Sequence, residues 1–342
     1  MRVFEIRDRF GLDNLHLSSR DDPRPGPRDV LVRLKASSLN RRDLMMIEGS
    51  YNPRQRLPLI PLSDGVGEVI EVGEAVVNVS VGDRVSGTFV QGWSRRPVPR
   101  DATILRRTLG GPIDGMLCEF CVLPEDGLVK VPPYLSDLEA ATLPCVGPTA
   151  WSALVAEGGL KPGETLVVQG TGGVALFALQ LAKLLGARVI VTSSSDEKLE
   201  RARALGADAC VHYGRHSAWA REVLRLTDGR GADHVLELGG AGTFNESVKA
   251  VRAGGRISVI GVLAGRRGEI ELAPILMRNL SVQGVFVGAR EDFEALNSAM
   301  AQHSLRPVID TVFPFEEAKA AFERLASAQH FGKIVVAHSC GA

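Results

Sequence analysis

The chain of 342 residues is long enough for two domains, and its 45% hydrophobic and 23% charged residues are ordinary for a globular protein. The 40 basic and 40 acidic residues cancel, so nothing favours nucleic acid or an anionic membrane surface as a partner. No apolar run reaches the roughly 18 residues of a transmembrane helix, and the charged N-terminus is unlike a signal peptide. With five cysteines, an odd number, we expect a reduced, cytoplasmic chain.

The first third of the chain predicts a β-rich domain. It begins with a strand at the N-terminus, and turns of Gly, Pro and Asp separate the strands that follow. These strand candidates are Asp29–Ala36, Gly67–Val72, Arg84–Phe89 and Leu117–Val122. Small and β-branched residues alternate along residues 65–73, which is typical of a tight barrel.

Residues 93–115 interrupt this pattern with many Arg and Pro residues, which predicts a long surface loop. Long loops in compact domains are often functional, and this one could cover the substrate site. An apolar substrate pocket could include Met45, Phe89, Trp93 and Leu117. The alternative is that these side chains pack in the core, which is favoured for Phe89 and Leu117.

From Leu135 onward, short apolar strands alternate with helical periodicity. The six strand candidates are Leu166–Gln169, Arg188–Thr192, Ala209–His212, His234–Leu238, Arg256–Ile260 and Ser281–Phe286. This alternation predicts an α/β fold with a doubly wound, six-stranded parallel sheet. Two helices from about Arg290 and a closing strand, Lys333–Val336, complete the chain.

The most informative stretch of the chain, residues 166–181, is predicted to be a strand, a glycine turn and the start of a helix. Gly170, Gly172 and Ala175 fill the G-x-G-x-x-G/A positions of a dinucleotide-binding turn, and Gly173 and Val174 open the helix. The N–H groups and dipole of that helix end suit a pyrophosphate. The alternative is a glycine-rich turn without a ligand.

The tip of the second strand bears on which dinucleotide binds. NAD-specific folds usually place Asp or Glu there, but this strand runs into three serines, including Ser193 and Ser194. Asp196 and Glu197 resemble the first turn of the next helix, and Lys198 follows. Small hydroxyls with a cation suit the 2′-phosphate, so we predict NADP(H). The alternative is that Lys198 is a solvated helix residue.

Taken together, the chain resembles the medium-chain dehydrogenase/reductase superfamily, and most closely its zinc-free quinone and enone reductases. The resemblance rests on residues 36–43, 61–67, 81–85, 140–150, 204–207 and 332–335, with the glycine turn. It implies a GroES-like catalytic domain, residues 1–126 and 289–342, and a Rossmann domain, residues 127–288. The active site would lie in the cleft between the two domains.

Zinc members of the superfamily bind their catalytic metal at positions that match Asn40, Ser63 with Asp64, and Cys145 here. Catalytic zinc needs about three N, S or O ligands, and one thiol with one carboxylate does not supply them. We therefore expect no catalytic zinc. Cys118 and Cys121 form a C-x-x-C pair in a predicted strand without a second pair, which favours two small buried residues over a metal or redox site.

The resemblance also implies the candidate catalytic residues, which are Asn40, Asp43 and Asp64. Asn40 would lie near the nicotinamide and donate to a substrate carbonyl, and Asp43 would support the cleft. The alternatives are a turn residue for Asn40, and a helix-start cap or buried salt-bridge partner for Asp43. Many quinone reductases carry a tyrosine where this chain has Met45, so we predict no side-chain general acid. The proton would come from water or a ribose hydroxyl.

The remaining cofactor residues follow from the resemblance. Thr149 would lie beside the nicotinamide ring and its ribose, and Tyr213 beside the 2′-phosphate with Lys198. Gly261 and Val262 close the fifth strand and Phe286 lies on the sixth, where backbone groups would bind the carboxamide and ribose.

These observations predict an NADPH-dependent, zinc-independent oxidoreductase that transfers hydride to a quinone or an α,β-unsaturated carbonyl, a small-molecule substrate. One alternative is a zinc-free alcohol or aldehyde oxidoreductase, and another is a non-catalytic NADPH-binding sensor. The resemblance implies a homodimer, and the apolar sixth strand is an edge that would need to be covered.

Overall fold

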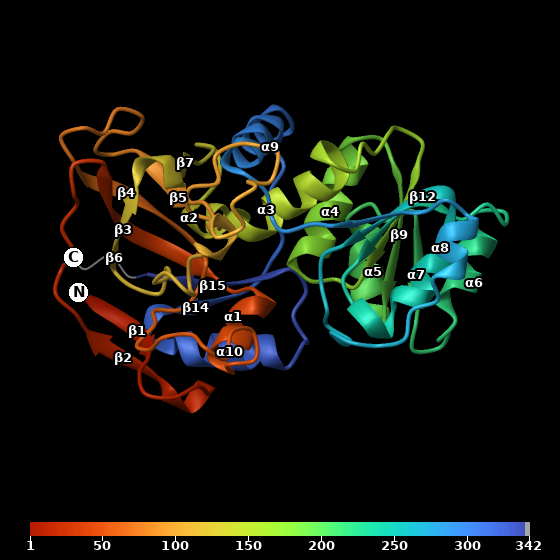
Figure 1. Cartoon of the computed structure of the whole chain (residues 1–342), viewed down its shortest axis with the longest axis horizontal. Helices are drawn as coiled ribbons and strands as arrows, with labels where there is room; N and C mark the ends of the chain where they lie inside the picture. The colour runs from red at the N-terminus through yellow and green to blue at the C-terminus, as the bar shows by residue number, and fades with distance from the viewer. Residues whose placement is uncertain (339–342) are drawn as a thin grey trace. The chain divides into compact units, whose positions relative to one another are not determined.

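The computed structural model describes residues 1–338, which form two compact units (Figure 1). The first unit contains Met1–Pro148 and the chain from Ala289 onward, and the second contains Thr149–Gly288. Residues 127–148, which the sequence analysis places in the Rossmann domain, group with the first unit by their contacts. Within the described residues, no helix is both long and apolar enough to cross a membrane.

The first unit is built on a seven-stranded sheet with the order β14-β15-β3-β4-β5-β7, in which β6 also pairs with β3. Its strands are β3 (Asp29–Ser38), β4 (Asp64–Val72), β5 (Arg84–Gly87), β6 (Phe120–Pro124), β7 (Leu128–Lys130), β14 (Ile309–Pro314) and β15 (Lys333–Ala337). All neighbours are antiparallel except β14 and β15. A separate antiparallel pair comprises β1 (Arg2–Ile6) and β2 (Leu15–Ser19).

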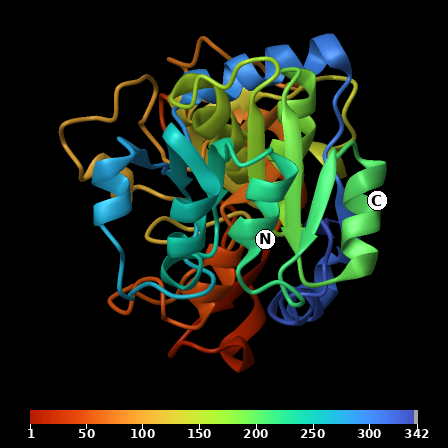
Figure 2. The same ribbon diagram turned by 90° about the vertical axis from the view of Figure 1, so that its right-hand side faces the viewer.

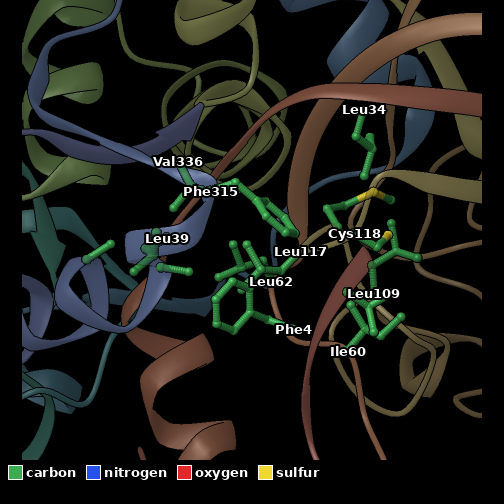
Figure 3. Close-up of a cluster of buried hydrophobic side chains, with 14 of the residues drawn as sticks. Phe4, Leu34, Leu39, Ile60, Leu62, Leu109, Leu117, Cys118, Phe315 and Val336 are labelled. Carbon is green, nitrogen blue, oxygen red and sulfur yellow. The ribbon is translucent and has the colours of Figure 1, made fainter. Parts of the chain in front are cut away.

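Among the described residues, five α-helices belong to this unit or begin in it. They are α1 (Arg41–Ile47), α2 (Asp137–Ala140), α3 (Leu143–Trp151), α9 (Arg290–His303) and α10 (Ala318–Ala326). Aliphatic and aromatic side chains from the N-terminal, central and C-terminal parts of the chain form one core, in which Phe4, Leu62 and Leu117 lie beside Phe315 (Figure 3). The rings of Phe4 and Phe315 meet edge to face at 5.3 Å, which joins the first strand to the last third of the chain.

The second unit is a six-stranded sheet with the order β10-β9-β8-β11-β12-β13, and every neighbouring pair is parallel. Its strands are β8 (Thr165–Gln169), β9 (Arg188–Ser193), β10 (Ala209–His212), β11 (Ala232–Glu237), β12 (Val251–Val259) and β13 (Ser281–Gly284). Its helices are α4 (Gly173–Leu184), α5 (Asp196–Ala204), α6 (Trp219–Leu226), α7 (Phe244–Ala250) and α8 (Ala273–Met277). Helices cover both faces of the sheet (Figure 2), which confirms the predicted doubly wound fold.

Burial explains why these segments form strands. Every residue of β8 and of β11 is buried, as expected for central strands covered by helices on both faces. The strand order changes direction at β8, which lies between β9 and β11. In open α/β sheets, ligands bind outside the carboxyl ends of the strands at such a switch point.

Several strands differ from their predicted bounds, and the differences at β6 and β13 move predicted residues off their strands. Leu117 and Cys118 lie outside β6, because Leu117 accepts a hydrogen bond from the Phe4 amide at 3.0 Å and Cys118 pairs with Val3. The sixth parallel strand, β13, ends at Gly284, so the placement of Phe286 on it is wrong. The Val285 amide donates to the Val259 carbonyl, after which the chain leaves the sheet.

Candidate active site

A group of buried polar residues lies where three strands of the first unit meet. We call it the polar cluster, and it comprises Ser38, Asn40, Ser63, Asp64 and Lys333. The carboxyl end of β3 meets the amino ends of β4 and β15, because both neighbours run antiparallel to it. Ser38 ends β3 opposite Asp64, the first residue of β4, and Lys333 is the first residue of β15. The topology therefore brings together residues nearly the whole chain apart.

The ammonium of Lys333 is the centre of the polar cluster. Its Nζ donates to Asn40 Oδ1 at 2.7 Å, to the Leu39 carbonyl at 2.9 Å and to Asp64 Oδ2 at 3.1 Å. Lys333 is 3% exposed and Asp64 is fully buried, so little water screens this ion pair.

The hydroxyls of the cluster complete its hydrogen bonding. Asp64 accepts from Ser63 Oγ at 2.9 Å and from Ser38 Oγ at 3.3 Å. Ser63 Oγ in turn accepts from Asn40 Nδ2 at 3.3 Å. The cluster is therefore a connected network of a cation, a carboxylate, an amide and two hydroxyls.

Asp43 lies in the first turn of helix α1, whose N-cap is Asn40. Its Oδ2 accepts from the Asn40 amide N–H at 2.8 Å, and its Oδ1 accepts from Arg42 Nη1 at 3.3 Å. Both alternatives considered for this residue, a helix-start cap and a buried salt-bridge partner, are therefore present. Burial raises the pKa of Asp43 to about 6, although the Arg42 guanidinium acts in the opposite direction.

Arg42, which sequence reasoning missed, anchors the end of the 93–115 segment. Its guanidinium donates to the carbonyls of Leu109 at 2.6 Å and Gly111 at 2.8 Å, and lies 5.1 Å and 5.2 Å from the ring centroids of Phe89 and Tyr51. Arg42 stands between Arg41 and Asp43 in the sequence and its partners are distant along the chain, so the local pattern did not distinguish it.

The start of the same segment docks on helix α9. The Arg290 amide donates to the Trp93 carbonyl at 2.9 Å, and Arg96 Nε donates to both Asp292 oxygens at 3.0 Å. Trp93 and Phe89 are each 3% exposed and Leu117 is fully buried, which matches the core-packing alternative for these side chains. Of the four residues considered for an apolar pocket, only Met45 is partly exposed.

The residues present do not fit a catalytic zinc ion. Within residues 1–338, no three His, Cys, Asp or Glu side chains gather closely enough to hold a metal. At the three matching positions stand Asn40, Ser63 with Asp64, and Cys145, and the ammonium of Lys333 already neutralises Asp64.

The C-x-x-C pair consists of free thiols. Cys118 is buried outside β6, whereas Cys121 lies within that strand. Burial raises the pKa of Cys121 to about 12 and also raises the pKa of Cys118, so neither thiol is activated.

The glycine turn lies in the second unit at the carboxyl end of β8. Gly170 has φ of +76°, a left-handed conformation that favours glycine, and its amide donates to the Thr192 carbonyl at 2.7 Å. Gly172 caps helix α4, and Gly173 and Val174 form its first turn. Ala175 is 1% exposed, as close packing of helix and strand requires. The turn therefore presents the N-terminus of a twelve-residue helix at the switch point of the sheet.

The predicted 2′-phosphate residues gather beside the tip of β9. Ser193 is the last residue of that strand and pairs with His212, and its carbonyl accepts from the Tyr213 amide at 3.0 Å. Ser194 and Tyr213 are exposed, and Lys198 lies in the first turn of α5. No carboxylate lies at the strand tip itself, because Asp196 begins α5 as predicted.

Arg215, which was not predicted from the sequence, also lies near the tip of β9. The turn after β10 brings it back toward β9, and its guanidinium forms an exposed ion pair with Asp196. A Cβ added to Gly214 would lie 3.9 Å from the Ser194 Cβ, so this turn passes directly beside the serines. The sequence signal was a basic residue two positions after Tyr213.

The remaining predicted cofactor residues lie elsewhere in the second unit. Gly261 and Val262 follow β12 rather than closing it, and the Gly261 amide donates to the Glu237 carbonyl at 3.1 Å. A Cβ on Gly261 would lie 2.4 Å from the Leu238 carbonyl oxygen, so only glycine fits there. Phe286 is 37% exposed beyond β13, and Thr149 is buried in α3.

Glu237 is a further residue that the sequence analysis did not single out. Its Oε1 accepts from the Gly239 and Gly240 amides, both at 2.8 Å, and its Oε2 accepts from Gln169 Nε2 at 2.8 Å. Gln169 Oε1 accepts from the Leu238 amide at 3.0 Å. This fully buried carboxylate therefore ties the loop after β11 to the end of β8, beside the glycine turn.

Comparisons with known proteins agree with this architecture. Residues 26–133 match the family described as alcohol dehydrogenase GroES-like domain, and residues 173–302 match the zinc-binding dehydrogenase family. A zinc-type alcohol dehydrogenase-like protein of Schizosaccharomyces pombe is 41% identical, over 95% of this chain and 96% of its own length. An acryloyl-coenzyme A reductase of Metallosphaera sedula is 31% identical over 92% of this chain and 94% of its length.

Solved structures extend the likeness. A putative alcohol dehydrogenase of Sinorhizobium meliloti is 43% identical with a TM-score of 0.91, covering 98% of both chains. An NAD-dependent alcohol dehydrogenase is 35% identical with a TM-score of 0.90, covering 98% of this chain and 99% of that one. A mycobacterial protein in complex with NADPH is 26% identical with a TM-score of 0.82, again over 98% and 99% of the two chains. The chain thus belongs to the medium-chain dehydrogenase/reductase superfamily of oxidoreductases.

Proposed function

We propose that this protein uses NADPH to reduce a quinone or an α,β-unsaturated carbonyl compound without a catalytic metal. The observation that carries the proposal is the polar cluster, in which an amide, Asn40, is held by hydrogen bonds at a position where zinc members carry a metal ligand. The acryloyl-coenzyme A reductase among the relatives acts on a conjugated carbonyl, as its name states.

The chemistry needs a hydride donor and a hydrogen-bond donor. When bound, the dihydronicotinamide supplies the hydride and its two electrons. Addition to the β-carbon of an enone moves charge onto the carbonyl oxygen, and a donor placed there stabilises the enolate. Asn40 would make this hydrogen bond through Nδ2, and a proton from water would complete the saturated product. Direct reduction of a ketone builds a more basic alkoxide, which favours the conjugated substrate in the absence of a metal or strong acid.

We propose NADPH rather than NADH as the cofactor because of the residues near the tip of β9. Ser193, Ser194, Lys198 and Tyr213 would surround the 2′-phosphate, and Arg215 adds a second cation there. Gly170, Gly172, Gly173 and Val174 would hold the pyrophosphate through backbone N–H groups. Thr149, Gly261, Val262 and Phe286 would contact the nicotinamide half.

A second candidate is an alcohol or aldehyde oxidoreductase, because the Schizosaccharomyces pombe and Sinorhizobium meliloti relatives carry alcohol dehydrogenase names. In that reaction Asn40 would donate to the reacting carbonyl itself. The two candidates differ in the carbon that receives the hydride.

We also propose that the protein is a cytoplasmic homodimer. The edge strand β13 is exposed along its whole length, and α8 carries Leu276 and Met277, which are 79% and 80% exposed. A second copy that pairs its own β13 with this edge would cover both. The four described cysteines are free thiols, as in a reducing compartment.

The proposal is tested by NADPH oxidation with 9,10-phenanthrenequinone, an enal and a saturated aldehyde. Deuterium from NADPH labelled at C4 should appear at the β-carbon of the reduced enal. Label only at the carbinol carbon would establish the second candidate. Tight NADPH binding without turnover of any substrate would instead indicate a non-catalytic NADPH-binding sensor.

A further inference from the structure

Lys333 has no proton left for a substrate. An ammonium carries three N–H donors, and all three are used, on Asn40 Oδ1, the Leu39 carbonyl and Asp64 Oδ2. The side chain is 3% exposed, so these bonds hold it in one arrangement. Any contribution of this cation to the reaction must therefore pass through one of its neighbours.

Among these neighbours, Asn40 is the one that can accept a hydrogen bond from Lys333 and also donate one to a substrate. A carboxamide has an acceptor end and a donor end, and an ammonium can bond only to the acceptor. The bond of 2.7 Å from Lys333 therefore fixes Oδ1 toward the cation and Nδ2 away from it. One Nδ2 hydrogen points to Ser63 Oγ at 3.3 Å, and the second meets no acceptor among residues 1–338.

The charge of Lys333 also changes the strength of that second donor. A hydrogen bond to a charged group polarises its partner, and bonds along a chain strengthen one another in a buried, low-dielectric setting. Withdrawal of electron density at Oδ1 makes the Nδ2 hydrogens more positive. The arrangement places a fixed positive charge one amide away from the free N–H.

We propose that Lys333 is a positioning residue that holds and polarises the Asn40 amide, so that its free N–H binds the substrate carbonyl oxygen. The cation thereby takes the electrostatic part that a metal ion plays in zinc members, one hydrogen bond further from the substrate. This inference rests on the proposed carbonyl reduction. The competing explanation is that the Lys333–Asp64 pair only joins β15 to β4.

The test is a double-mutant cycle on the full-length protein. Replacement of Lys333 alone would leave Asp64 buried and unpaired, so the pair is neutralised together in Lys333→Met/Asp64→Asn. We expect this variant to lose about tenfold in kcat, while the Kd for NADPH, measured by fluorescence, stays unchanged. In an Asn40→Ala background, the same neutralisation should have no further effect on kcat. A merely structural pair would give equal losses in both backgrounds, which would overturn the proposal.

Two further variants keep the test decisive if the neutralised pair folds poorly. Asn40→Asp retains an acceptor for Lys333 but removes the free N–H, so kcat should fall as far as in Asn40→Ala. Lys333→Arg retains the charge and should preserve more activity than the neutralised pair. Lys319→Met removes a partly exposed lysine of the same unit and serves as the matched control. If the Asn40→Asp variant had the same kcat as the wild type, the proposal would be contradicted.

Failure of the two proposals can be told apart. A wild-type protein that reduces none of the three carbonyl substrates contradicts the proposed function. A wild-type protein that turns over, but whose neutralised pair loses nothing or loses equally with and without Asn40, contradicts the role of Lys333 alone.

Discussion

At the scale of single residues, burial decides how two histidines respond to acid. His234 lies 2.8 Å from Ser258 Oγ and His338 lies 2.9 Å from Ser37 Oγ. Burial lowers the pKa of His234 to about 3 and that of His338 to about 4. Both rings are therefore neutral in the folded protein at physiological pH.

The consequence for stability has a definite sign. At pH values below the ordinary histidine pKa of 6.5, His338 binds a proton in the unfolded chain but stays neutral in the folded protein. Unfolding free energy should fall as pH drops from 6.5 to 4, by about 3 kcal/mol for His338. His338→Gln should flatten this decline in urea titrations. Parallel pH curves for wild type and His338→Gln would contradict the assignment.

A second residue-scale prediction concerns the cofactor phosphate. Lys198→Ala and Arg215→Ala should each weaken NADPH binding by about tenfold, because each removes a charge near the 2′-phosphate. Neither should change the Kd for NADH, which lacks that phosphate. Isothermal titration with both nucleotides measures the difference, and Lys249→Ala, on an exposed lysine of α7, is the control. Equal affinity of the wild type for NADH and NADPH would refute the NADPH proposal.

At the scale of elements, alanine substitutions at two glycines can distinguish the cost of backbone strain from the loss of a cofactor contact. Gly170 and Gly163 have φ of +76° and +80°, and a Cβ at either position would meet no atom within 4 Å. Alanine at either should therefore cost about 1–2 kcal/mol of backbone strain in thermal unfolding. Only Gly170→Ala should also weaken NADPH binding, since Gly163 lies before β8. Unchanged NADPH affinity in Gly170→Ala would remove this turn from the cofactor site.

The elements also show how far sequence reasoning reaches. The parallel strands were predictable because buried strands such as β8 are short apolar runs between turns. Strand β14 was missed because its residues are half-buried or exposed, so its pattern is weak. Lys333 was found as part of a strand but not as a site residue, because its partner Asp64 is 269 positions away. Such pairings depend on sheet topology, which the local pattern does not contain.

At the scale of the whole molecule, the exposed edge of the second unit predicts the assembly. Leu276→Asp/Met277→Asp would place charges in the proposed dimer contact and should yield monomers by sedimentation. Val81→Asp alters a residue of the first unit that is 63% exposed, and should leave the dimer intact. A wild-type chain that sediments as a monomer at micromolar concentration would exclude the homodimer.

The central claim is that Asn40 and its network, rather than a metal ion, polarise the substrate carbonyl. The most direct measurement combines zinc analysis with turnover on one sample, before and after exhaustive treatment with a strong chelator. We predict far less than one zinc per chain and an unchanged rate of NADPH oxidation with the enal. About one tightly held zinc per chain, with activity lost on chelation and restored by zinc, would contradict the account.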